Sequence, residues 1–266
     1  MKNNQKIISL GFALTLLALS AACASESART EPVTTKTDKG VSTAPPAKEV
    51  EQRDKSLVRF IHVLPGFAAV DGFVGNAKEF NNVAYKAVTP YKEIPDNQSM
   101  FAIKPAGQEG AQPFAQNDEG ISGGKHYTAI AMPATDGKAT LHVVSDKLTP
   151  PATGKANVRI VHASPDAGEV DVFVKGQTSS LFSGVNPQAV TNYSDVDPMK
   201  VTLEVRPQGS KTVALTIPNV SFEAGHLYTI VVSGKAKGQP KLEALTIDDK
   251  LDGMMVDARP SPTVMR

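Results

Sequence analysis

Val158-Arg159-Ile160-Val161-His162 restates an earlier stretch, Val58-Arg59-Phe60-Ile61-His62, at an offset of 100 residues. More residues match beyond both stretches, at offsets that drift only from 100 to 103, as small loop insertions would produce. These matches pair Pro65 with Pro165, Val70-Asp71 with Val170-Asp171, Tyr91 with Tyr193, Tyr127-Thr128 with Tyr228-Thr229, and Asp146-Lys147-Leu148 with Asp249-Lys250-Leu251. Self-similarity at a fixed spacing indicates a duplicated structural unit. We therefore expect two homologous domains, 56–150 and 155–251, joined by a Pro- and Gly-containing stretch at 149–154.

Within each copy the pattern is one of short strands and turns. Runs rich in Val, Ile, Thr and aromatic residues cover 57–64, 69–74, 99–104, 126–132 and 139–145, then 157–163, 169–174, 199–206, 211–217, 226–233 and 240–247. Pro207-Gln208-Gly209 lies between two alternating runs and predicts a hairpin. No window longer than about ten residues has a helical period. The pattern predicts an all-β fold of two tandem β-sandwich domains, Ig-like or Greek-key, with a barrel as the alternative.

The repeat also resembles a known family. Val-Arg-Ile-Val-His-Ala-Ser-Pro-Asp-Ala at 158–167 and Val-Asp-Val-Phe-Val at 170–174 are similar to the extracytoplasmic bacterial domain-of-unknown-function family 4397. The first copy departs from that pattern, with Leu64-Pro65-Gly66 in place of Ser-Pro-Asp and Lys104 in place of Arg. The resemblance implies an exported, often duplicated, all-β domain, and it implies no activity, because the family has none assigned.

The N-terminus has the pattern of a targeting segment. Lys2 and Lys6 precede the apolar run 7–19, which is shorter than the roughly 20 residues that a membrane-spanning helix needs. Small residues then lead to Cys23, the only cysteine, so that the segment resembles a bacterial lipobox, with Ser20 where Leu is usual. We expect a signal peptide at 1–22, a lipid on Cys23, and a lipid-anchored disordered linker at 23–55. Residues 252–266 are expected to form a C-terminal tail.

The resemblance to a lipobox implies a place in the cell. A diacylated Cys23 would make the membrane a partner through the N-terminal lipid. Ala24 follows the cysteine where an inner-membrane retention signal tends to have Asp. The expected localisation is therefore the cell envelope, at the outer membrane or cell surface, facing the periplasm or the exterior. The rival interpretation is ordinary signal cleavage that leaves Cys23 as a free thiol.

Composition excludes several function classes. The chain has 266 residues and a formal net charge of +1, which gives no electrostatic reason to expect a nucleic-acid partner. One cysteine excludes an intrachain disulfide framework and a multi-thiolate metal site. The histidines lack zinc-site spacing and no nucleotide-binding motif occurs, so we expect no metal and no cofactor. Calcium at the acidic clusters Asp195/Asp197 or Asp248/Asp249/Asp252 stays an alternative, although these clusters lack a calcium-loop pattern.

The repeated polar residues have two interpretations. The pairs His62/Asp71 and His162/Asp171 are expected to be structural, with each strand-end histidine bonded to backbone or to the following aspartate; a ligand contact in each copy is the alternative. No residue is expected to be catalytic, and the chain is not expected to be an enzyme. A Ser–His–Asp arrangement would need His162, Ser164 and Asp171, but Leu64 occupies the serine position of the first copy.

The strand face opposite each histidine contains an arginine. Arg59 and Arg159 alternate with the histidines and are expected to cover apolar surface with their stems while they pair with a carboxylate.

Taken together, these features predict a lipid-anchored envelope protein whose tandem modules bind envelope glycan or protein, or have a structural role. The alternative is an envelope hydrolase that uses His162, Ser164 and Asp171.

Overall fold

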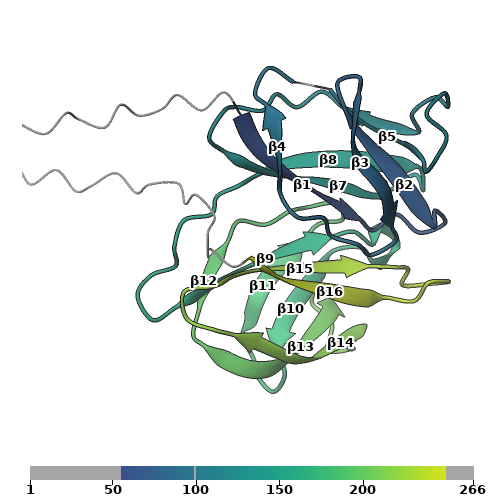
Figure 1. Ribbon diagram of the computed structural model, residues 1–266. Helices are drawn as coiled ribbons and strands as arrows, with labels where there is room; N and C mark the ends of the chain where they lie inside the picture. The colour runs from purple at the N-terminus through teal and green to yellow at the C-terminus, as the bar shows by residue number, and fades with distance from the viewer. Residues whose placement is uncertain (1–54, 99, 250–266) are drawn as a thin grey trace, which may run out of the picture. The chain divides into compact units, whose positions relative to one another are not determined.

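The structure is a computed structural model that describes residues 55–98 and 100–249 (Figure 1). The predicted signal peptide, the lipidation residue Cys23, almost all of the predicted linker and the tail at 252–266 lie outside the described residues. Within the described part, no helix is long and apolar enough to cross a membrane.

The first repeat is a sandwich of two four-stranded sheets. One sheet has the order β4-β1-β7-β8 and the other has the order β3-β2-β5-β6. Its strands are β1 (Lys55–His62), β2 (Ala69–Val74), β3 (Ala77–Ala84), β4 (Lys92–Pro95), β5 (Phe101–Pro105), β6 (Ala115–Asn117), β7 (His126–Pro133) and β8 (Ala139–Asp146). Val58 and Phe60 of β1 pack with Val70 and Ile103 from the second sheet in the core between them.

The second repeat has the same arrangement. Its sheets have the orders β12-β9-β15-β16 and β11-β10-β13-β14. Its elements are β9 (Ala156–His162), the 3-10 turn η1 (Pro165–Ala167), β10 (Val170–Val174), β11 (Ser180–Val185), β12 (Ser194–Val196), β13 (Met199–Pro207), β14 (Leu215–Phe222), β15 (Leu227–Ser233) and β16 (Glu243–Asp249). The prediction of an all-β fold with two domains is confirmed, and the described strands form open sheets, not a barrel.

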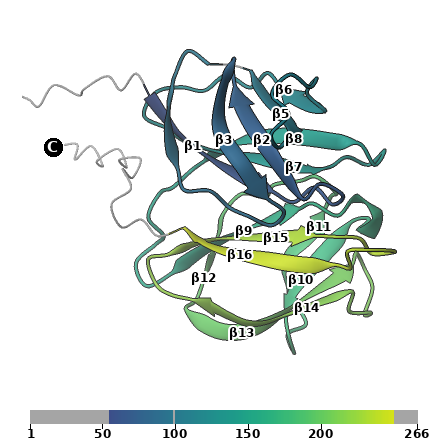
Figure 2. The same ribbon diagram turned by 45° about the vertical axis from the view of Figure 1, so that its right-hand side comes forward.

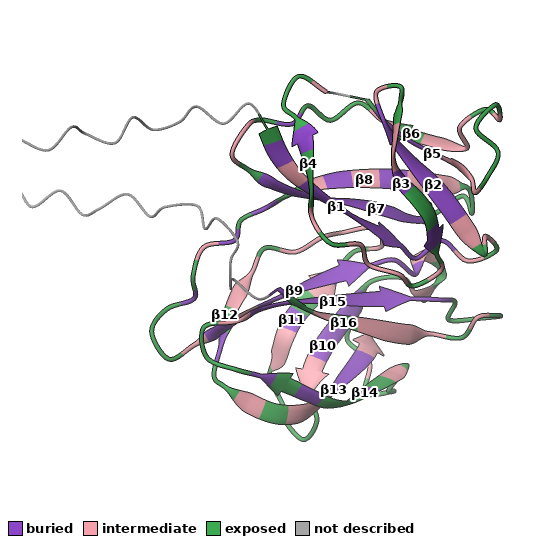
Figure 3. Ribbon diagram, in the orientation of Figure 1, coloured by how far each residue is buried: buried purple, intermediate pink, exposed green. Residues whose placement is uncertain are grey.

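A parallel pair of strands lies at the centre of each repeat. β1 is parallel to β7, with Phe60 opposite Ala129, and β9 is parallel to β15, with Ile160 opposite Ile230. Every residue of β15 is buried, as are all but the last of β7, and Figure 3 shows both strands in purple along most of their length. A strand that is buried on both faces has a nearly continuous run of apolar residues, so apolar and polar residues do not alternate along β7 and β15.

The second face of these central strands is covered by the other repeat. Ile61 and Ile130 of the first repeat pack with Val161 and Val231 of the second in one apolar cluster. The sheets that contain β1 and β9 therefore lie against each other, inside the two outer sheets that contain β2 and β10 (Figure 2). Burying each such side chain contributes about 1.5–3 kcal/mol. The contact between the repeats is therefore a third hydrophobic core, in addition to the core of each sandwich.

The eleven predicted strands correspond to eleven of the sixteen strands in the described part of the chain, ten of them with small boundary shifts, and five strands were not predicted. The missed strands are β3, β4, β6, β11 and β12, all at the edges of their sheets. These strands are short or mostly polar, so their sequences have little apolar pattern. The hairpin at 207–209 is confirmed, since β13 pairs with β14 in antiparallel register. Its returning strand begins at Leu215, not at 211, because a longer loop precedes it.

Candidate functional site

The alternation of β1 and β9 places an arginine of each strand between the repeats. Val58 and Phe60 point into the core of the first repeat, whereas Ile61 on the other face belongs to the cluster between repeats. Arg59 shares that other face and is 3% exposed; Arg159 of β9 is 2% exposed. Two guanidinium groups are thus buried where the sheets of the two repeats meet.

Each arginine pairs with an aspartate of the other repeat. Arg59 forms an ion pair with Asp249, at the end of β16, and both side chains are buried. Arg159 Nη2 lies 2.5 Å from Asp146 Oδ1, at the end of β8, and both side chains are again buried. The two pairs are reciprocal, since each repeat supplies one arginine and one aspartate. The expected carboxylate partners are therefore present, but they belong to the opposite repeat, and the arginines are buried, not surface-lying.

A threonine and a tyrosine complete each half of this network. Thr128 accepts a hydrogen bond from Arg59 Nε at 2.9 Å and donates one to Asp146 at 2.5 Å. Tyr91 donates to the same carboxylate at 2.8 Å, and its ring lies 4.9 Å from the Arg59 guanidinium carbon. Each repeat therefore orients its own arginine and its own aspartate, which then pair across the contact.

The second repeat holds the same groups in the same way. Thr229 accepts from Arg159 Nε at 3.0 Å and donates to Asp249 at 2.9 Å. Tyr193 donates to Asp249 at 3.3 Å, and its ring lies 4.7 Å from the Arg159 guanidinium carbon. We call these eight residues the ionic network: Arg59, Tyr91, Thr128, Asp146, Arg159, Tyr193, Thr229 and Asp249.

The Asp146–Arg159 pair of the ionic network stays ionised although both side chains are buried. Burial opposes ionisation of Asp146, but Arg159 and Arg59 outweigh it and hold the pKa of Asp146 below its ordinary value. Burial also opposes the charge of Arg159, yet Asp146 and its hydrogen bond raise the pKa of that arginine. Burial raises the pKa of Tyr91 and of Tyr193, so both phenols remain neutral hydrogen-bond donors.

The two predicted histidines are buried and bonded to backbone. The Leu64 amide donates to His62 Nδ1 at 3.3 Å, so Nε2 carries the proton and donates to the Phe67 carbonyl at 3.1 Å. His162 repeats the arrangement, with its Nε2 2.8 Å from the Gly168 carbonyl. Burial lowers the pKa of both imidazoles, so both are neutral at pH 7. Each histidine therefore closes the loop that follows its strand.

The two predicted aspartates lie apart from these hydrogen bonds. Asp171 accepts from the Gly184 amide at 2.8 Å and from the Gly209 amide at 3.1 Å. Burial opposes its charge, but these bonds prevail and lower the pKa of Asp171. Asp71 accepts from the Asn82 and Gly107 amides at 2.7 and 3.0 Å. Each carboxylate thus joins an edge strand of its outer sheet, β3 or β11, to the turn after β5 or β13, and its hydrogen bonds do not go to the histidine of its repeat.

The residues of the alternative hydrolase interpretation are engaged elsewhere. Ser164 Oγ donates to Asp166 at 3.1 Å, and the Ser164 amide, not its hydroxyl, faces His162 Nδ1 at 3.4 Å. Ser164 is fully buried. The geometry thus brings His162 and Ser164 together through the backbone and leaves Asp171 bonded to Gly184 and Gly209.

The acidic clusters form ordinary ion pairs. Asp197 binds Lys155 at 2.6 Å, and Asp248 lies 3.0 Å from His226 Nδ1. Asp249 belongs to the ionic network, and Asp252 lies outside the described residues. Among the described residues, no group of three or more His, Cys, Asp or Glu side chains is placed to hold a metal ion.

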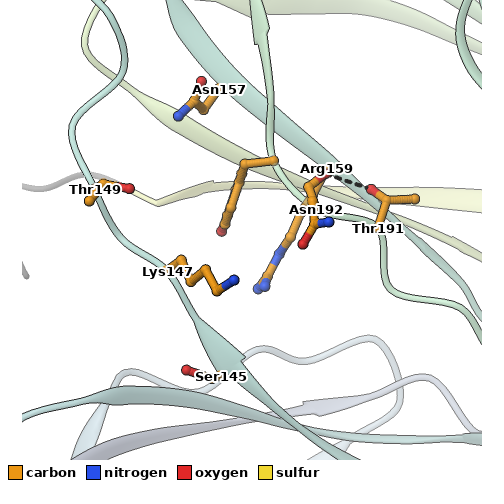
Figure 4. Close-up of a pocket in the computed structure, with 8 residues that line it drawn as sticks. Ser145, Lys147, Thr149, Asn157, Arg159, Thr191 and Asn192 are labelled. Atoms are coloured by element: carbon orange, nitrogen blue, oxygen red, sulfur yellow. Dashed lines mark hydrogen bonds between the residues drawn. The ribbon is translucent and has the colours of Figure 1, made fainter.

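A polar pocket opens beside the ionic network. It has a volume of about 320 Å³ and is lined by Ser145, Lys147, Thr149, Asn157, Arg159, Thr191, Asn192 and Tyr193. Figure 4 shows the side chains of Lys147 and Arg159 directed toward the same part of this space. Two lining residues are cationic and the other six are neutral and polar, so the pocket offers donors and positive charge without a lining carboxylate. We call it the Arg159 pocket.

The sequence predicts no role for several residues of the ionic network. Tyr91 and Tyr193, and the aspartates at the ends of β8 and β16, match between the copies, but the sequence alone does not indicate that they meet in a site. The available signal was that these polar residues recur in both copies next to predicted strands. The Arg159 pocket gave no such signal, because its residues come from segments that meet only in three dimensions.

The family model described as domain of unknown function (DUF4397) matches residues 56–173 and 156–256. The solved structure of the C-terminal domain of AlgF from P. aeruginosa is similar at 23% identity, over 36% of this chain and 98% of that chain, with a TM-score of 0.29. No curated protein matches the chain.

Proposed function

The chain belongs to the DUF4397 family in two tandem copies, and we propose that it is a lipid-anchored cell-envelope protein whose copies act together as one non-catalytic binding or structural module. Its partners are then the membrane, through the N-terminal lipid, and an envelope glycan or protein. The observation that carries the joint action is the reciprocal pairing of Arg59 with Asp249 and of Arg159 with Asp146.

The ionic network supports joint action of the repeats because of its physical cost. A buried ion pair loses the hydration of two charges, and this loss is offset only when both partners and their hydrogen bonds are in place. Separating the repeats would leave four charges without their partners. Together with the apolar cluster between the repeats, the network therefore favours a fixed arrangement of the two sandwiches over independent domains on a linker.

We propose a non-catalytic role because the polar residues that recur in both repeats are engaged in structural hydrogen bonds. A general base needs a ring nitrogen within hydrogen-bond reach of the nucleophile. Both nitrogens of His162 face backbone groups, and the Ser164 hydroxyl donates to Asp166. These bonds support a structural role for the recurrent His and Asp residues.

The anchor is proposed from the N-terminal pattern. An apolar run that is too short to span a bilayer precedes small residues and the only cysteine. A diacylated Cys23 would hold the two sandwiches at an envelope membrane, and Ala24 favours the outer membrane or cell surface.

Fractionation of cells that express the full-length chain tests the anchor. Wild type should sediment with membranes and incorporate a radiolabelled fatty acid, whereas Cys23→Ser should appear in the soluble fraction without label. Ser25→Ala, two residues away, is the matched control and should behave like wild type. Fatty-acid labelling of Cys23→Ser, or a soluble wild-type protein, would refute the lipid anchor.

Co-sedimentation tests the binding role. Detergent-solubilised full-length protein is mixed with purified insoluble cell-wall glycan and centrifuged. Saturable retention supports a glycan partner. If the glycan does not retain the protein, chemical crosslinking in intact cells should give a defined protein adduct, and failure of both would leave only the structural role.

A further inference from the structure

The Arg159 pocket has a chemical character that the proposed function does not assign. We infer that it binds a small acidic compound with hydroxyl groups, such as a sugar that bears a phosphate or a carboxylate, with Lys147 and Arg159 at the anionic group. The inference rests on the proposed binding role of the repeats, but not on the lipid anchor. A volume of about 320 Å³ suits a ligand of the size of one charged hexose.

Positive charge is the first reason. Arg59 and Arg159 are balanced by Asp249 and Asp146, which leaves Lys147 as an additional cation at the same place. Lys147 is exposed and forms no ion pair with any described residue. A cation beside a buried guanidinium, with no carboxylate in the lining, favours an anion in the pocket.

The nearby carboxylates do not oppose this inference. Asp146 and Asp249 lie on the buried side, where each accepts hydrogen bonds from a threonine, a tyrosine and an arginine. Asp195 is opposite Asn157 in the register of β12 and β9, but it does not line the pocket, and its charge acts on Lys155.

An unpartnered acceptor is the second reason. Asn157 is one of the lining residues, and its Oδ1 atom is buried and accepts no hydrogen bond from any described residue. A buried polar atom without a partner costs about 1–3 kcal/mol, so such atoms call for an explanation. The Asn157 side chain also lines the pocket, so a ligand hydroxyl would hydrogen-bond to its amide group. The hydroxyl groups of Ser145, Thr149 and Thr191 lie among the same lining residues and suit further hydroxyls of the ligand.

The position that exchange of the two repeats would give this pocket lacks an equivalent lining, which makes the site single. The repeat offsets place Leu57 at the position of Asn157, Pro90 at that of Asn192, and Asp248 at that of Ser145. Asp248 pairs with His226 at 3.0 Å. A carboxylate there would repel an anion, and Leu57 cannot accept a hydrogen bond. We therefore expect one ligand for each chain, not two.

Isothermal titration calorimetry on the detergent-solubilised full-length chain tests the inference. Glucose 6-phosphate and glucuronate are the phosphate and carboxylate probes, and glucose and inorganic phosphate are the controls. At low ionic strength at least one acidic sugar should bind with a stoichiometry of one and at least tenfold more tightly than both controls. Equal binding of glucose would refute the anion site, and equal binding of inorganic phosphate would refute recognition of hydroxyl groups.

Three variants localise the binding. Lys147→Ala should weaken the acidic sugar at least tenfold, and Ser145→Asp, which copies Asp248 of the second repeat, should abolish its binding. Asn157→Leu, which copies Leu57 of the first repeat, should weaken the sugar but not inorganic phosphate. Lys211→Ala, at an exposed lysine of the β13–β14 loop, is the charge-matched control and should leave binding unchanged.

The outcomes separate this inference from the proposed function. No saturable binding of either acidic sugar, or binding that Lys147→Ala and Ser145→Asp leave unchanged, would overturn the Arg159 pocket as the site. Fatty-acid labelling of Cys23 and retention on cell-wall glycan are measured independently of the pocket, so the proposed function can fail or survive separately. Circular dichroism of each variant verifies that a lost signal reflects the pocket and not unfolding.

Discussion

Arg59 and Asp249 are 190 residues apart in the chain and form a buried ion pair between the two repeats. The pair has a counterpart with the roles of the repeats exchanged, Arg159 with Asp146. A surface patch that contacts its own copy in this way is the arrangement of a two-fold symmetric dimer. In this chain the two copies are covalently joined, so the equivalent of a dimer interface forms within one molecule.

Removing one charge of that pair should destabilise the protein strongly. Among the described residues, Arg59→Met leaves the buried Asp249 with Thr229 and Tyr193 as its side-chain partners, which should lower the free energy of unfolding by about 3–5 kcal/mol. Urea unfolding followed by circular dichroism measures the change. The double variant Arg59→Met/Asp249→Leu removes both charges and should recover most of the loss.

The control for this prediction is an exposed ion pair. Lys55 and Glu93 are 2.8 Å apart, and both side chains are largely exposed. Lys55→Met should not shift the urea midpoint measurably, because solvent screens such a pair. An Arg59→Met variant as stable as Lys55→Met would contradict the structural role of the ionic network.

The buried histidines should make stability depend on pH. Burial lowers the pKa of His62 and His162 in the folded chain, whereas in the unfolded chain it is about 6.5. The stabilisation is therefore complete above about pH 6.5 and is lost as the pH falls through the lower pKa of the folded chain. Urea midpoints should be constant from pH 8 to 7 and should decrease from about pH 6.5 toward pH 5.

Variants assign that pH dependence to the two imidazoles. His62→Gln/His162→Gln should show a shallower decrease between about pH 6.5 and 5 than wild type. His142→Gln, at a partly exposed histidine of β8, should keep the wild-type slope. The lowered pKa of Asp146 and of Asp171 acts at more acidic pH and leaves this window to the histidines. An unchanged slope in the double variant would refute the assignment.

Asp171 should be needed as a carboxylate, not merely as a polar group. In Asp171→Asn the new NH₂ group meets the Gly184 or the Gly209 amide, so one donor loses its acceptor. We expect a loss of about 1–3 kcal/mol in the free energy of unfolding. Asp118→Asn, at an exposed position, is the control and should be neutral. Thermal unfolding that is the same for both variants would contradict the role of Asp171 in joining β11 to the turn at Gly209.

Ser164 should be unreactive. A serine-directed fluorophosphonate probe should not label the detergent-solubilised full-length chain, because His162 offers no free ring nitrogen to activate the hydroxyl. Ser164→Ala should give the same background as wild type. Labelling that disappears in Ser164→Ala would instead support the hydrolase alternative.

Several features of the fold could be predicted because they depend on local pattern. The duplication is visible in Val58–His62 and Val158–His162, and the alternation within these stretches predicts which residues face the core of each repeat. The edge strands β3 and β12 could not be predicted from apolar pattern, because their buried residues are too few to give one: Phe80 and Val83 in β3 and Val196 in β12.

The sequence by itself determined the repeat, the strand-rich class and the residues that alternate toward each core, because periodicity and turn chemistry act over a few neighbouring positions. The tertiary structure alone decided that Arg59 and Arg159 are buried, that each pairs with the opposite repeat, and that Lys147 and Asn157 line one pocket. These facts depend on which sheet face meets which. The apolar faces around Ile61 and Val161 pack against each other and so fix which sheet faces meet. These residues are 100 positions apart in the chain, and a pattern over a few neighbouring positions cannot predict that contact.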